Sequence, residues 1–234
     1  MSEYKSPNFD LRSGSVKYLI MHYTGMASGQ EALDRLCDEN AAVSAHYVIE
    51  ESGQIHSLVE EDKRAWHAGV SKWEGNEDIN DLSIGIEIVN TGHPYPGYES
   101  VYQKFPHEQM KAVISLAREI MTRHNIKLWD VIGHSDVAWQ RKIDPGELFD
   151  WKGLALEGIG IWHDYVETDG DFEIDLNNFL KNAKLYGYDI EGCYDNPTAL
   201  ISAFQRHFRQ ANFDGILDQE TSLILENLLT KKFN

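Results

Sequence analysis

The pattern of apolar positions predicts that strands and helices are mixed in the N-terminal two thirds of the chain. Residues 16–23 (VKYLIMHY) form a short apolar run rich in β-forming residues, which is typical of a buried strand. Residues 82–89 (LSIGIEIV) alternate in character, so the three isoleucines of a second strand face one side and Glu87 faces the other. A carboxylate on an otherwise apolar strand is the first unusual feature of the sequence.

A long helix is predicted over residues 107–125, because its apolar residues recur at helical spacing and Pro106 stands where a helix start tolerates proline. The other predicted elements are a helix over 30–40, a hairpin over 45–59 that turns at Glu51-Ser52-Gly53, and a strand over 128–133. Elements in this order predict an α/β fold, with a mixed central sheet flanked by helices.

The C-terminal part of the chain has a different pattern. A polar segment, Thr168-Asp169-Gly170-Asp171, reads as a linker. Three helical stretches follow it, over residues 176–186, 197–210 and 219–229. We therefore predict a catalytic domain over 1–168 and a small all-helical domain over 172–234.

Composition and charge exclude some classes of protein. The chain has 234 residues, of which 42% are hydrophobic and 25% charged, as in ordinary globular proteins. A net charge of -17 disfavours binding to nucleic acid, which would repel it. No apolar run is long enough to span a membrane. The two cysteines, Cys37 and Cys193, are predicted to be free thiols. We expect a monomer, although no pattern fixes the oligomeric state.

Three polar residues stand out near predicted strand ends. His22 lies at the end of the first strand, His134 follows a later short strand, and Asp144 comes shortly after it. Side chains at strand ends converge at one edge of the sheet, where α/β proteins usually place their sites. Two imidazoles and a carboxylate would suit one catalytic zinc ion with an open fourth position. The alternative is that these residues only cap the strand ends.

Two further residues fit the same predicted site. Glu87 could act as a general base for the attacking water, or it could be a buried partner for a lysine or histidine. Lys142 precedes Asp144 by two residues and points the same way if that segment is extended, so it could stabilise an oxyanion. The alternative for Lys142 is a solvated surface lysine. Five other histidines are assigned surface or supporting roles: His93, His107, His124, His163 and His207.

Five ordered segments carry a resemblance to a known family: LIMHYTG (19–25), SAHYVIEESGQI (44–55), AWHAG (65–69), SIGIEIVN (83–90) and GHSDVAWQRKIDPGELFDW (133–151). They resemble the N-acetylmuramoyl-L-alanine amidases of the AmpD/AmiD type, whose zinc-amidase fold is shared with peptidoglycan recognition proteins and phage T7 lysozyme. The sequence departs from many relatives at Trp139 and Glu147, where they have proline.

The resemblance implies a hydrolase that cleaves the amide between N-acetylmuramic acid, or its 1,6-anhydro form, and L-alanine of peptidoglycan or muropeptides, in cell-wall turnover or recycling. It implies these site residues: zinc ligands His22, His134 and Asp144; catalytic Glu87 and Lys142; and His46, His67 and Asn90 lining or supporting the cleft. A core histidine remains the alternative for His46. A non-catalytic peptidoglycan-binding module and a stem-peptide peptidase are the alternative functions.

The helical tail resembles the peptidoglycan-binding module of AmiD-like enzymes, although a plain appendage is the alternative. Such a module predicts wall material as substrate and a location in the envelope or periplasm. The N-terminus has no apolar signal-peptide core, which would instead favour the cytoplasm and recycling. We expect the envelope, and the preference between polymeric wall and anhydro-muropeptides stays open.

Overall fold

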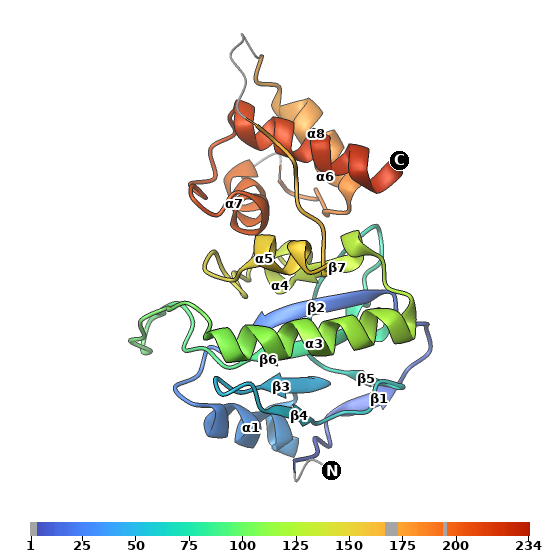
Figure 1. Cartoon of the computed structure of the whole chain (residues 1–234), viewed down its shortest axis with the longest axis vertical. Coiled ribbons are helices and arrows are strands. Elements are labelled where there is room, and N and C mark those ends of the chain that lie inside the picture. Colours follow the sequence, from blue (N-terminus) through green and yellow to red (C-terminus); the bar gives the residue numbers. More distant parts are fainter. Residues whose placement is uncertain (1–3, 167–172, 194–195) are drawn as a thin grey trace.

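The centre of the fold is a five-stranded mixed sheet (Figure 1). A computed structural model describes residues 4–166, 173–193 and 196–234. The strands, in sheet order, are β4 (Ile55–Ser57), β3 (Tyr47–Ile49), β6 (Ser83–Ile88), β2 (Tyr18–Tyr23) and β7 (Val131–Gly133). β2 is parallel to both β6 and β7, and only the edge pair β3–β4 is antiparallel. The predicted α/β class and the predicted hairpin are therefore confirmed.

One face of the sheet is covered by α3 (His107–His124), as Figure 1 shows. The isoleucines of β6 and the alternate residues Leu19 and Met21 of β2 pack with the apolar stripe of this helix in one buried cluster. Pro106 caps the helix start, and Asn125 ends it in a left-handed conformation. The face of β6 that carries Glu87 therefore points away from α3, as the alternation predicts.

Shorter elements complete the N-terminal part. They are α1 (Gly29–Cys37) with a 3₁₀ turn after it (Glu39–Ala41), α2 (Ile79–Leu82), α4 (His134–Val137), α5 (Trp151–Leu156), and a two-stranded sheet of β1 (Phe9–Leu11) and β5 (Lys63–Ala65). The predicted strand over 128–133 is half wrong, because Leu128–Asp130 is a 3₁₀ turn and only the last three residues are β7.

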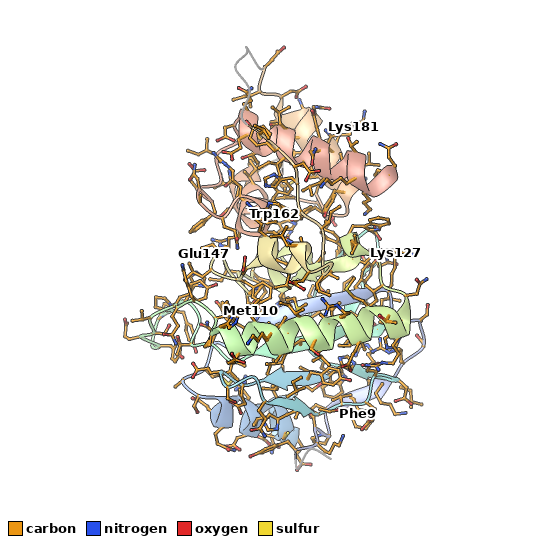
Figure 2. All side chains as sticks on the ribbon, viewed as in Figure 1. Phe9, Met110, Lys127, Glu147, Trp162 and Lys181 are labelled. Atoms are coloured by element: carbon orange, nitrogen blue, oxygen red, sulfur yellow. The ribbon has the colours of Figure 1, made fainter. Side chains whose placement is uncertain are left out.

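The C-terminal tail contains α6 (Leu176–Tyr186), α7 (Pro197–Phe208) and α8 (Gln219–Phe233), so its three predicted helices are confirmed. The predicted linker at 168–171 lies outside the described residues, and the domain boundary stays a prediction. One buried apolar cluster includes Phe204 and Phe208 of α7 together with Ile20 and Ile132 of the sheet. Trp162 packs against it where the tail meets the rest of the fold (Figure 2).

Within the described ranges, no helix has the length and apolar character that crossing a bilayer requires.

Candidate metal centre

The parallel pairing of β2 with β6 and β7 brings the candidate residues to one edge of the sheet. His22 lies in register with Glu87 across the β2–β6 pair, so their side chains leave the same face. β7 ends at Gly133, and His134 begins the short helix α4 directly after it. The chain then returns, and the backbone N–H of Ser135 donates to the carbonyl oxygen of Asp144 at 2.9 Å.

His22, His134 and Asp144 place one potential ligand atom each within 4.8 Å of the others, and all three residues are buried. The two Nδ1 atoms of the histidines are 3.0 Å apart. Asp144 Oδ2 lies 3.1 Å from His22 Nδ1 and 3.0 Å from His134 Nδ1. Three residues from separate parts of the chain therefore converge at a single point.

The tautomer of His22 follows from a chain of hydrogen bonds behind it. The hydroxyl of Ser83 donates its one proton to the carbonyl oxygen of Ile79 at 2.6 Å, so it can only accept from His67 Nε2, 3.2 Å away. His67 is buried, its pKa lies well below the usual value, and neutral His67 must then accept at Nδ1. The donor is Nε2–H of His22 at 3.0 Å, which leaves His22 Nδ1 with a free lone pair.

The tautomer of His134 follows from a single hydrogen bond. Its Nε2 lies 3.1 Å from the carbonyl oxygen of Ala68, which can only accept, so a neutral His134 also presents a free lone pair at Nδ1. Two imidazole lone pairs and the carboxylate of Asp144 thus face one another with no proton between them. These lone pairs and the carboxylate repel one another, and a cation placed between them would offset the repulsion. The donor set therefore fits a metal ion.

The charge states agree with this assignment. Burial, reinforced by nearby His134, lowers the pKa of His22 to about 4, so its imidazole is neutral at physiological pH. The site therefore offers a neutral imidazole at His22 beside the carboxylate of Asp144, and both kinds of group ligate metals.

Glu87 faces the same cleft. Burial and then the negative charge of Asp144 raise its pKa well above the usual value, while Lys142 opposes the rise. Its Oε2 atom is buried and has no hydrogen-bond partner among the described residues. A cation on the ligand set would offset the charge of Asp144 and lower this pKa. Glu87 therefore has one buried oxygen that is free to exchange a proton, and its role as a general base stays a prediction.

The cleft above the ligand set has a volume of about 610 Å³. Lys142 and Asp144 both line it, as do His67 and, farther out, the stacked rings of Tyr95 and Tyr98. Lys142 is half-buried and is close enough to influence the pKa values of both His22 and Glu87. Its position agrees with the predicted orientation towards the pocket, and its role in the reaction stays a prediction.

His46 and Asn90 lie elsewhere, since neither is among the described residues that line this cleft. Fully buried His46 accepts from the backbone N–H of Gly85 at its Nδ1, 3.0 Å away, which matches the alternative of a core histidine. Asn90 holds the next loop: it donates to the carbonyl oxygen of Gln103 at 2.9 Å and accepts from Gly92. Contact of either residue with a substrate stays a prediction.

Sequence reasoning missed a contact between the tail and the segment that carries His134 and Asp144. His207, assigned only a surface or supporting role, is buried, and its Nδ1 donates to Asp136 Oδ2 at 2.7 Å. The available signal was its spacing, since His207 lies three residues after Phe204 on the apolar face of α7.

Comparisons with known proteins agree with this geometry. Residues 12–147 match the family described as N-acetylmuramoyl-L-alanine amidase. The chain is 37% identical to N-acetylmuramoyl-L-alanine amidase AmiD of Escherichia coli, over 92% of this chain and 83% of that protein.

Solved structures of similar proteins extend the likeness to the tail. The complex of E. coli AmiD with the substrate anhydro-N-acetylmuramic acid-L-Ala-D-gamma-Glu-L-Lys has a TM-score of 0.84 at 35% identity, covering 99% of this chain and 92% of that one. AmpDh3 of Pseudomonas aeruginosa in complex with anhydromuramic pentapeptide has a TM-score of 0.84 at 36% identity, covering 93% and 92%.

Proposed function

The chain belongs to the N-acetylmuramoyl-L-alanine amidase family, and we propose that it cleaves the muramoyl–L-alanine amide with one zinc ion held by His22, His134 and Asp144. The observation that carries the proposal is the ligand set itself. Three lone-pair donors meet at the floor of an open cleft, and each imidazole has its other nitrogen engaged by a protein acceptor. A nitrogen-rich set with one carboxylate and a free position is typical of catalytic zinc.

Zinc, when bound, supplies Lewis-acid chemistry: it lowers the pKa of water towards about 7 and polarises a carbonyl group. The protein supplies the proton transfers. Glu87 accepts a proton as the water oxygen attacks the carbonyl carbon of the lactyl amide. The carbon–nitrogen bond then breaks, and Glu87 returns that proton to the departing amine of L-alanine. The products are a muramyl sugar with a free carboxylate and a free stem peptide.

Lys142 lines the cleft beside Asp144, where its ammonium group can stabilise the negative charge that forms on the carbonyl oxygen. His67 and Ser83 keep His22 in the tautomer that presents Nδ1 to the metal. Each residue of the proposed scheme therefore has a separate task.

The substrate that we propose is a muropeptide with an anhydro-muramoyl or muramoyl end. Both solved relatives described above were captured with anhydro-muramoyl peptides, and this chain matches them over nearly its whole length. The cleft volume of about 610 Å³ lies within the range of pockets that bury a small ligand, and so suits the muramoyl group and first stem residues.

A paired digest tests the proposal. Intact sacculi and anhydro-muropeptides are treated separately with the purified chain, and the products are identified by mass spectrometry, with a chelated sample and a His22→Ala variant as controls. We expect free stem peptides beginning with L-alanine, loss of turnover on chelation and recovery when zinc is restored. Cleavage inside the stem peptide, or full activity of the chelated protein, would refute the proposal.

A further inference from the structure

The helical tail forms a group of side-chain hydrogen bonds with one segment of the N-terminal part, residues 133–151, which carries His134, Lys142 and Asp144. Five such bonds join the two: Tyr188 and His207 to Asp136, Trp139 to Asp189, Gln140 to Glu191, and Gln210 to Phe149. In addition, Arg206 forms an ion pair with Glu147 at 3.6 Å, on the segment that follows Asp144. Glu147 is labelled in Figure 2, at the level where the tail meets the rest of the fold.

Asp136 is the centre of these contacts. Its side chain is fully buried, and both oxygens are occupied. Oδ2 accepts from the backbone N–H of Gly133 and from His207 Nδ1, each at 2.7 Å, while Oδ1 accepts from the hydroxyl of Tyr188 at 2.6 Å. Two of its three donors therefore come from the tail. A buried carboxylate that loses such donors must find others, and its backbone moves to do so.

The backbone around Asp136 positions two of the three proposed ligands, His134 and Asp144. Gly133, which Asp136 holds, directly precedes His134, and the carbonyl oxygen of His134 accepts from Ala138 at the end of the same turn. Ser135, between His134 and Asp136, donates its N–H to the carbonyl oxygen of Asp144. A shift at Asp136 is therefore passed to two of the three ligands through a turn of only four residues.

The ring of His207 also stacks on Trp151, at the far end of the segment, with ring centroids 3.9 Å apart. Stacking and hydrogen bonding are thus separable functions of this one side chain. Trp139 and Glu147, the two departures noted in the sequence, both contact the tail.

We infer that His207 and Tyr188 of the tail are positioning residues of the metal centre, which act through Asp136 to hold His134 and Asp144 in ligating geometry. The tail is then a structural part of the active site and not only a module appended to it. This inference rests on the proposed function, because it requires that the three residues bind zinc.

The test measures zinc affinity of the full-length chain by competition with a chromogenic chelator, and the visible spectrum of the cobalt-substituted protein. Tyr188→Phe removes one hydroxyl, and His207→Phe removes the donor but keeps a ring to stack on Trp151. Each should weaken zinc binding about tenfold, as loss of outer support of a ligand does. His207→Asn, which keeps a donor near the Nδ1 position but loses the ring, should recover most of the affinity.

Lys232→Met is the matched control. The ammonium group of Lys232 joins α8 to Glu74 at 2.5 Å, so this variant weakens tail docking away from the ligand segment. We expect it to lower the melting temperature yet to keep the zinc affinity and cobalt spectrum of the wild type.

The outcomes separate the inference from the proposed function. If Tyr188→Phe and His207→Phe bind zinc as tightly as Lys232→Met does, the tail is only docked and the inference is wrong. The same holds if His207→Asn binds no better than His207→Phe. If His207→Phe does not fold, Tyr188→Phe decides. A wild-type chain that binds no zinc would instead overturn the proposed function.

Discussion

Gly85 offers a sharp test of how the metal centre is supported. It lies on β6, between Ser83 and Glu87 on the strand face that carries the site. A Cβ atom at this position would lie 2.4 Å from Cγ and 2.5 Å from Nδ1 of His67. Carbon atoms in contact prefer about 3.5 Å or more, so the ring in Gly85→Ala must withdraw by roughly 1 Å. A shift of that size breaks the 3.0 Å hydrogen bond that fixes the tautomer of His22.

Zinc affinity and folding stability should then fall together. Loss of outer support for a ligand weakens metal binding about 10–100-fold, which corresponds to about 1.4–2.8 kcal/mol. Overpacking a buried position costs about 1–3 kcal/mol of folding stability. Chelator competition measures the first quantity, and urea unfolding of the metal-free protein measures the second.

The double variant Gly85→Ala/His67→Ala separates the clash from any other effect. With the ring removed, the added methyl group has space. Gly85→Ala should therefore lower the free energy of unfolding only slightly in the His67→Ala background. The coupling between the two sites should reach about 0.5–3 kcal/mol. The reasoning fails if Gly85→Ala keeps wild-type zinc affinity. It also fails if Gly85→Ala lowers the free energy of unfolding by the same amount in the His67→Ala background as in the wild type.

Three further predictions address catalysis and stability. Glu87→Gln should retain one zinc ion by elemental analysis but lower kcat/KM on muropeptides by about 10²–10⁴, and unchanged turnover would remove Glu87 from the scheme. Lys142→Met should lower kcat about 10²–10³ with little change in KM; a change in KM alone would make Lys142 a binding group. Burial, and then the charge of Glu74, raises the pKa of Asp130 to about 6, so the native state loses stability as the pH rises from about 3.8 through 6. Asp130→Asn should therefore raise the melting temperature by a few degrees at pH 7.5 and leave it unchanged near pH 3.5, and an equal shift at both pH values would contradict this pKa.

The sequence predicted the elements that have a clear period. The alternation in β6 placed Glu87 on the face opposite the isoleucines, and the apolar stripe over 107–125 gave α3 almost to the residue. β1 and β5 could not be predicted, because three residues are too few to show a period, and their stability comes from pairing with each other.

Parts of the site were predictable for a different reason. His22 lies near the end of β2 and His134 directly follows β7, its neighbour in the sheet, so topology groups these two residues. Asp144 joins them through the return of the chain after α4. The support of His22 by His67 and the hold of His207 on Asp136 depend on packing between distant segments, which no local pattern encodes. The assignment of His46 to the cleft came from the resemblance, and its contacts are those of a core histidine.

The strand order has a consequence for how the protein is made. β2 is the first strand of the large sheet to emerge from the ribosome, yet both of its neighbours, β6 and β7, are translated much later. A nascent chain must therefore carry β2 without either neighbour until β6 has been made, about 60 residues later, and the metal centre cannot assemble before Asp144 has left the exit tunnel.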